Sequence, residues 1–188
     1  VRYSLENPRA YIESNVLGTF NVMEAARVHG VTHLMMASTS SVYGANTRMP
    51  FHENDKADMP LTIYAASKKA NEAMAHSYAH LWDIPTTMFR FFTVYGAWGR
   101  PDLALYKFVD AMLEGRPIDI YNNGDMYRDF THVKDLVRGI RLLMDVPPVR
   151  PTCASDIMEG DSLSPVAPHR VVNIGNSDKV RLMDFIDA

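Results

Sequence analysis

The chain has 188 residues, a length typical of one domain and sufficient to bury a hydrophobic core. A hydrophobic content of 47%, a charged content of 22% and a net charge of −3 give no electrostatic reason to expect binding to nucleic acid or to an anionic membrane. No apolar run reaches the ~18 residues that would cross a bilayer. The single cysteine, Cys153, cannot form an internal disulfide, which fits a reducing cytoplasm.

The hydrophobic pattern alternates between helical periods and short apolar runs. Asn7 and Pro8 suit the start of a helix, and Gly30 suits its end. Further helices are expected at residues 63–82, 103–114 and 133–144 and from residue 180 onward, with short strands at 31–37, 86–92, 118–121 and 171–174. Strands that alternate with helices predict an α/β fold with a parallel sheet, in which ligands bind beyond the carboxyl ends of the strands.

Tyr64 and Lys68 lie four residues apart in the helix expected at 63–82, so they share one of its faces. An ammonium beside a phenol favours the phenolate, a general base that can take a proton from an alcohol. The hydroxyl-rich segment 38–41 follows an expected strand. A Tyr–Lys pair alone is a weak signal, but with this segment it indicates oxidation of a hydroxyl group, which requires a hydride acceptor that no side chain supplies.

Five segments extend this pattern: Asn15-x-x-Gly18-Thr19-x-Asn21, residues 38–44, residues 64–68, residues 90–96 and residues 127–133. In this order and at this spacing the sequence resembles the extended short-chain dehydrogenase/reductase family of nucleotide-sugar epimerases and dehydratases, over nearly the whole chain except about residues 147–169. The resemblance implies a partial Rossmann-like parallel sheet flanked by helices, plus part of a smaller substrate-binding domain.

The resemblance also implies how the chain is organised. Residues 1–95 would form the C-terminal part of the dinucleotide-binding domain with its catalytic residues. Residues 96–188 would form mainly the substrate-binding region, with interleaved Rossmann elements. Residues 147–169 contain five prolines and few bulky apolar residues, so we expect a flexible loop there.

Members of this family open with a strand, a glycine-rich turn and a helix that hold the dinucleotide pyrophosphate. These 188 residues contain no G-x-x-G-x-x-G or G-x-G-x-x-G, and they begin with Val1. We therefore expect a fragment that is inactive alone, from a parent enzyme that forms a homodimer through helices at about 7–29 and 62–82.

By resemblance, the cofactor is NAD and the substrate is a UDP-sugar. Thr39 would hydrogen-bond the reacting hydroxyl, Tyr64 would take its proton, and Lys68 would hold the nicotinamide ribose. Ser38 and Val94 would also contact the cofactor. The plainer alternatives are a turn-forming hydroxyl for Thr39 and a surface lysine for Lys68. No metal is expected.

The residues after Thr39 separate the family's reactions. Ser40 and Ser41 stand where related dehydratases and decarboxylases place carboxylates, which favours simple oxidation and re-reduction, as in an epimerase. Thr93 and the Gly-Arg-Pro-Asp that includes Arg100 resemble UDP-glucuronate 4-epimerases, and an arginine fork suits a uronate carboxylate. An ion pair with Asp102 is the alternative for Arg100.

Two more residues complete the expected substrate site. Arg128 would bind the diphosphate, or else pair with Asp129, and Tyr121 would line the uracil pocket, or else pack in the core. The parent is expected to interconvert UDP-glucuronate and UDP-galacturonate through a 4-keto intermediate. A UDP-glucose/galactose 4-epimerase, another enzyme of the sugar-nucleotide dehydratase type, and an inactive nucleotide-sugar-binding or dimerising remnant stay open as alternatives.

Overall fold

The computed structural model describes residues 1–187, without the side chains of Tyr121 and Asn122. The chain divides into two compact units. The first consists of Val1–Phe91 and Arg141–Asn173, and the second of Phe92–Ile140 and the residues from Ile174 onward.

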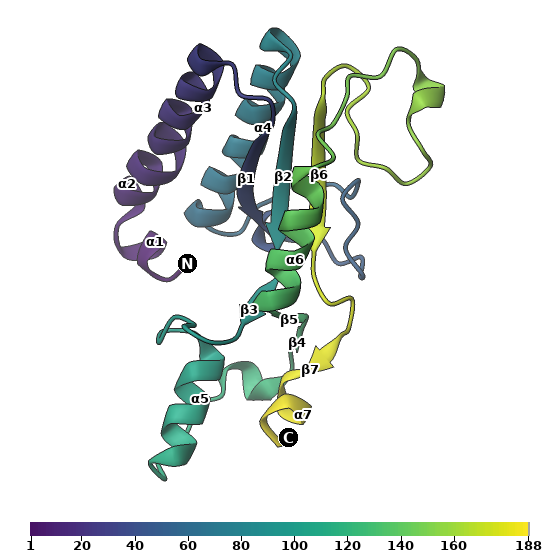
Figure 1. Cartoon of the computed structure of the whole chain (residues 1–188). Coiled ribbons are helices and arrows are strands. Elements are labelled where there is room, and N and C mark those ends of the chain that lie inside the picture. The colour runs from purple at the N-terminus through teal and green to yellow at the C-terminus, as the bar shows by residue number, and fades with distance from the viewer. Residues whose placement is uncertain (188) are drawn as a thin grey trace. The chain divides into compact units, whose positions relative to one another are not determined.

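The first unit is built on a three-stranded sheet with the order β1-β2-β6. Its strands are β1 (Leu34–Thr39), β2 (Thr86–Phe91) and β6 (His169–Ile174). Strands β1 and β2 are parallel, with Leu34 opposite Thr86 and Thr39 opposite Phe91, and the arrowheads of all three strands point the same way in Figure 1. The predicted α/β fold with a parallel sheet flanked by helices is confirmed.

The N-terminal helices of this unit follow one another with little interruption. They are α1 (Tyr3–Glu6), α2 (Pro8–Tyr11), a π-helical segment (Ile12–Leu17) and α3 (Gly18–His29). The Asn7 side chain accepts a hydrogen bond from the Ala10 N–H, and Gly30 ends α3 with a φ of 62°, so the predicted start and end signals both act as expected.

Helix α4 (Ile63–Trp82) occupies the residues that the sequence predicted. The Thr62 hydroxyl caps its first turn by accepting from the Ala65 N–H. The helix packs against β1 and β2, and α3 packs against α4 (Figure 1). The core between these elements consists of Met23, Ala26, Leu34, Ala75, Tyr78, Ile84 and Met88. Burial of these side chains stabilises the unit and fixes α4 on the sheet.

Residues 147–169 lie in the first unit and contact the C-terminal end of α4. Arg150 donates from Nη2 to the His80 carbonyl at 2.8 Å, from Nε to Asp83 Oδ1 at 2.9 Å and from Nη1 to the Val166 carbonyl at 2.6 Å. His76 Nε2 lies 2.8 Å from Ser164 Oγ. These bonds tie the proline-rich segment to the helix. Its expected flexibility stays a prediction.

The second unit has two small two-stranded sheets. Strands β3 (Thr93–Tyr95) and β5 (Phe130–His132) are parallel, whereas β4 (Tyr127–Arg128) and β7 (Val180–Arg181) are antiparallel. The helices are α5 (Ala104–Leu113), α6 (Val133–Met144), which continues into the first unit, and α7 (Leu182–Asp187). The strand predicted at 118–121 is wrong, because 118–120 are irregular and a 3-10 turn spans Tyr121–Gly124.

The carboxylate of Asp129 holds part of the second unit together. Its Oδ1 accepts from the Asn176 N–H and its Oδ2 from the Ser177 N–H, both at 2.8 Å, and the Thr131 hydroxyl donates to Oδ1 at 3.0 Å. The loop after β6 is thereby fastened beside β5. Across residues 1–187, no helix is both long and apolar enough to cross a membrane.

Candidate active site

Thr39 ends strand β1 and is buried. Its Oγ1 accepts from the Ser41 N–H at 3.2 Å and so caps the 3-10 turn Ser40–Tyr43. Gly44 follows with a φ of 54°, and a Cβ at that position would lie 1.9 Å from the Met59 carbonyl oxygen. Only glycine fits this turn, which sets the threonine at the carboxyl end of the sheet.

Tyr64, Lys68 and Glu72 follow one another at intervals of four on α4 and therefore share one face of the helix. Lys68 Nζ donates to the Ala37 carbonyl at 3.1 Å, two residues before Thr39. Burial lowers the pKa of Lys68. The helix face that carries Tyr64 is thus joined to the end of β1 through the lysine.

The N-terminal helices support the backbone of α4 next to Tyr64. The Tyr11 ring packs edge-on against the Tyr64 ring, with 6.0 Å between centroids. Asn15 Nδ2 donates to Ser67 Oγ at 2.9 Å, and that hydroxyl donates to the Tyr64 carbonyl at 2.8 Å. Asn15 therefore bonds a side chain of α4 from within the π-helical segment, a feature frequent at functional sites.

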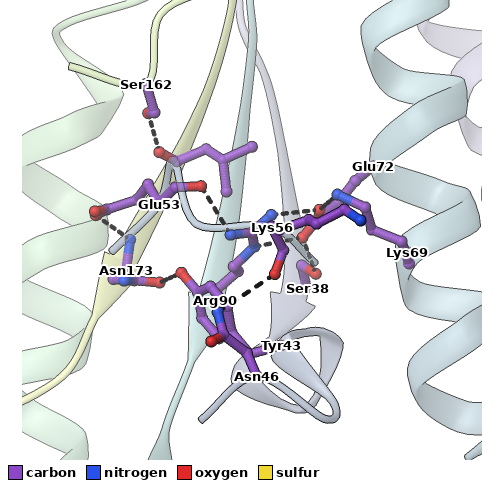
Figure 2. A network of polar contacts seen from close by, with 11 residues as sticks. Ser38, Tyr43, Asn46, Glu53, Lys56, Lys69, Glu72, Arg90, Ser162 and Asn173 are labelled. Atoms are coloured by element: carbon purple, nitrogen blue, oxygen red, sulfur yellow. Dashed lines mark hydrogen bonds and ion pairs between the residues drawn. The ribbon is translucent and has the colours of Figure 1, made fainter. Parts of the chain in front are cut away.

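A buried ion pair between α4 and the sheet is bonded to Ser38, the residue before Thr39 (Figure 2). Glu72 and Arg90 are 3% and 2% exposed and form two bonds, Nε to Oε1 at 2.9 Å and Nη2 to Oε2 at 2.8 Å. The Ser38 hydroxyl donates to Glu72 Oε1 at 2.6 Å, and Lys69 Nζ lies 2.9 Å from Oε2. Burial alone would raise the pKa of Glu72, but the bonds and charge of Arg90 outweigh it and lower the pKa to about 2.

Arg90 also holds the turn that follows Thr39 (Figure 2). Its guanidinium lies 4.7 Å from the centroid of the Tyr43 ring, and its Nη1 donates to the Glu53 carbonyl at 3.1 Å. The Tyr43 hydroxyl donates to Asn173 Oδ1 at 2.8 Å, and Glu53 Oε1 accepts from the Asn173 N–H. The turn, the loop that contains Glu53 and the end of β6 are therefore joined in one polar network.

The remaining predicted site residues belong to the second unit. Thr93 and Val94 lie in β3, opposite Phe130 and Thr131. Arg100 is exposed and forms the bidentate ion pair with Asp102 that the sequence left open, with Nε to Oδ1 at 2.9 Å and Nη2 to Oδ2 at 2.5 Å. This pairing lowers the pKa of Asp102 to about 2.

Arg128 and Tyr121 also belong to the second unit. Arg128 is exposed in β4, with its guanidinium near the Met126 sulfur. Asp129, its alternative partner from the sequence, binds the Asn176 and Ser177 N–H groups. The Tyr121 side chain, predicted to line the uracil pocket, lies outside the described residues.

Histidines 76 and 80 have the i,i+4 spacing of many metal-ligand pairs, but their rings have other contacts. His76 Nε2 is bonded to Ser164, and His80 Nδ1 lies 2.7 Å from the Val166 carbonyl. In the described part of the chain, no group of three or more His, Cys, Asp or Glu side chains could hold a metal ion.

Sequence reasoning assigned no role to Glu72 or to Arg90. The interval of four from Tyr64 through Lys68 to Glu72 was the available signal, because it places a carboxylate on the face of α4 that bears Tyr64 and Lys68. Arg90 stands at the head of the segment 90–96, opposite Ser38 in the register of β1 and β2. Its pairing with Glu72 depends on how α4 crosses the sheet.

Residues 1–152 match the NAD dependent epimerase/dehydratase family. The chain belongs to this family. A probable UDP-glucuronate 4-epimerase from Rhizobium meliloti is 57% identical over the whole chain, which covers 55% of that protein. UDP-glucuronate 4-epimerase 1 from Arabidopsis thaliana is 40% identical, with 43% of its length covered.

Solved structures agree with this membership. The UDP-glucuronic acid 4-epimerase from Bacillus cereus, in complex with UDP-glucuronic acid and NAD, is 29% identical with a TM-score of 0.77, over 95% of this chain and 51% of that one. The chain thus spans about half the length of the relatives it matches. The family is NAD-dependent.

Proposed function

We propose that the protein carrying this chain interconverts UDP-glucuronate and UDP-galacturonate through a 4-keto intermediate. The observation that carries the proposal is the placement of Lys68, whose ammonium joins the face of α4 that bears Tyr64 to the end of β1 that bears Thr39. Similarity to UDP-glucuronate 4-epimerases over the whole chain supports the choice of substrate.

Each of these three residues has a chemical role in the proposal. The Tyr64 phenolate takes the proton of the sugar 4-hydroxyl and later returns a proton to the 4-keto oxygen. Thr39 hydrogen-bonds that oxygen and orients it. The Lys68 ammonium favours the phenolate, because opposite charge stabilises the charged form. Bound NAD supplies the site for the hydride that leaves C4 and returns to it.

The donor set near Thr39 fits a nicotinamide ribose. A lysine ammonium has three donors, and one donor of Lys68 is used by the Ala37 carbonyl. Among the described residues the other two have no acceptor, so they can serve ribose hydroxyls. We propose that Ser38, through its backbone because its hydroxyl donates to Glu72, and Val94 form further contacts with the cofactor.

The carboxylates near Thr39 favour an epimerase over a dehydratase. Elimination of water needs an acid–base carboxylate, and Ser40 and Ser41 stand directly after Thr39. Glu72 is the carboxylate bonded to Ser38, and Arg90 holds its pKa at about 2. A glutamate that stays ionised at neutral pH cannot protonate a leaving hydroxyl, so Glu72 does not supply the acid that elimination needs, which favours oxidation and re-reduction at C4.

We propose that Thr93 and Arg100 recognise the uronate carboxylate, with Arg128 on the diphosphate and Tyr121 near the uracil. Arg100 already holds the carboxylate of Asp102 in the bidentate geometry that a uronate would require. Substrate binding would therefore exchange one carboxylate for another, or add the uronate to the same fork.

The protein is proposed to act as a homodimer. Ile12, Leu17 and Phe20 lie along the N-terminal helices, which pack on α4, and all three are exposed. Exposed apolar side chains on adjacent helices are typical of an interface between subunits. Light scattering of the full-length protein tests this, and a monomer at high concentration would contradict it.

We also propose that the 188-residue chain by itself is inactive. It contains no glycine-rich phosphate-binding turn, which normally supplies backbone amides to the pyrophosphate. Calorimetric titration of the isolated chain with NAD should show weak binding or none. Low-micromolar affinity, or turnover by this chain alone, would contradict the proposal.

Incubation of the full-length protein with UDP-glucuronate and with UDP-glucose tests the proposed substrate. We expect conversion of the first to UDP-galacturonate and slow or no conversion of the second. Preference for UDP-glucose would overturn the uronate assignment in favour of a UDP-glucose/galactose 4-epimerase. Loss of activity in Tyr64→Phe would tie the reaction to this site.

A further inference from the structure

We propose that Glu72 and Arg90 are positioning residues, which hold Thr39 against the catalytic face of α4. The inference rests on the proposed function, because it assigns them a role in the same reaction. Neither residue contacts the reacting atoms in this proposal. They act through Ser38, which precedes Thr39, and through Tyr43, which closes the turn after it (Figure 2).

The first anchor lies immediately before Thr39. Glu72 is one helical turn beyond Lys68 on α4, and its Oε1 accepts from the Ser38 hydroxyl at 2.6 Å. Arg90 stands opposite Ser38 on β2 and binds both oxygens of the same carboxylate. One carboxylate therefore fixes α4, β1 and β2 to one another, within one residue of Thr39.

The second anchor lies on the other side of Thr39. The guanidinium of Arg90 packs on the Tyr43 ring, and the Tyr43 hydroxyl donates to Asn173 on β6. The Phe51 ring also stacks on the Tyr43 ring, with 4.5 Å between the two centroids. Thr39 is thus held between two anchored residues, and Arg90 takes part in both anchors.

Because Glu72 and Arg90 are both buried, their ion pair is poorly suited to a purely stabilising role. A fully buried ion pair often adds no net stability over apolar residues of similar size, whereas breaking it is costly. What the pair supplies here is a fixed distance between α4 and the end of β1. A shift of about 1 Å in a catalytic group can lower a rate by about a hundredfold, so the position of Thr39 is the property that the pair controls.

Ser38→Ala in the full-length protein tests the proposal, because it cuts the link to Thr39 and leaves the ion pair in place. Thr87→Val is the matched control: Thr87 is also buried in this sheet, its hydroxyl bonds His33 at 2.9 Å, and it lies at the other end of β2 from the site. We expect kcat to fall about 10- to 100-fold in Ser38→Ala, with KM and bound NAD changed less than about twofold, and no fall in Thr87→Val.

Three outcomes would overturn the proposal: wild-type kcat in Ser38→Ala, an equal fall in both variants, or a fall explained by lost NAD. A double variant with Glu72→Gln adds a further check, since residues that act as one unit give non-additive losses. If the double variant lost the full product of the two single effects, Ser38 would not act through Glu72.

The assay uses UDP-glucuronate and UDP-glucose in parallel. If the wild-type protein converted UDP-glucose and not UDP-glucuronate, the proposed substrate would be overturned. The ratio of kcat between Ser38→Ala and the wild type would then be measured on UDP-glucose. Hydrogen exchange of the Ser41 amide, which donates to Thr39 Oγ1, needs no substrate. It should be about tenfold faster in Ser38→Ala and unchanged in Thr87→Val; unchanged exchange in both would overturn the positioning role.

Discussion

Acidification should destabilise the first unit through His169. This residue begins β6, is 5% exposed, and its ring lies 5.2 Å from the ring of His76, measured between centroids. Burial, and after it the charge of His76, lower the pKa of His169 from 6.5 to about 4. Glu72 opposes this shift, whereas Lys69 and Arg90 add to it.

The sign follows from proton binding. Between pH 6.5 and about 4, the unfolded chain protonates this histidine and the folded chain does not, so the free energy of unfolding falls as the pH falls. One pH unit corresponds to about 1.4 kcal/mol. The loss is therefore about 2 kcal/mol at about pH 5 and about 3 kcal/mol at about pH 4, and it levels off at about 3.4 kcal/mol at lower pH. The lowered pKa of His76 acts in the same direction.

Urea unfolding at about pH 7 and about pH 5 measures this loss in the full-length protein. Other histidines also titrate in this range, so the comparison is between the wild type and His169→Gln. The wild type should lose about 2 kcal/mol more than the variant between the two pH values. Equal losses in both would show that the folded state accommodates the imidazolium and would refute the reasoning.

Three further variants test other parts of the account. Lys68→Met should lower kcat by about 10²- to 10⁴-fold through loss of the phenolate-stabilising charge, and steady-state kinetics would contradict this if kcat were unchanged. Arg100→Ala should raise KM for UDP-glucuronate about 10- to 100-fold and leave KM for UDP-glucose nearly unchanged; an equal rise for both sugars counts against carboxylate recognition. Arg150→Met should lower the free energy of unfolding by about 1–2 kcal/mol and speed hydrogen exchange in 147–168, whereas Arg116→Met, which removes exposed ion pairs with Asp110 and Glu114, should do neither.

The elements that the sequence predicted best are those whose signals are local. Helix α4 begins and ends at the predicted residues, because Thr62 caps it and an alanine-rich period runs to Trp82. The strand predicted at 31–37 is found at 34–39. The apolar run did not reveal that pairing starts with the Leu34 N–H and the Pro85 carbonyl, or that it continues through polar Thr39.

The second unit was harder to predict because its strands are two or three residues long. Such strands show no period, and their pairing depends on residues far apart in the sequence, such as Tyr127 and Arg181. The alternation of Ile118 and Ile120 indicated a strand that does not form. The carboxylate of Asp129, which fastens the loop after β6, looked in the sequence like a partner for its neighbour Arg128.

The candidate site shows the same division between local and distant signals. Tyr64 and Lys68 could be paired from the sequence because the helix fixes their spacing. The bonds of Lys68 to Ala37 and of Glu72 to Ser38 join residues more than thirty positions apart. They depend on how α4 packs across the sheet, which the sequence pattern does not specify.

The central claim is that the residues at the end of β1 and on α4 oxidise and re-reduce one sugar carbon, with no carboxylate available for elimination. Conversion of UDP-glucuronate by the full-length protein in D₂O, analysed by mass spectrometry, tests it most directly. The account predicts UDP-galacturonate of unchanged mass, because the hydride that leaves C4 returns to it. Deuterium fixed on carbon, or a product lighter by one water, would contradict the account.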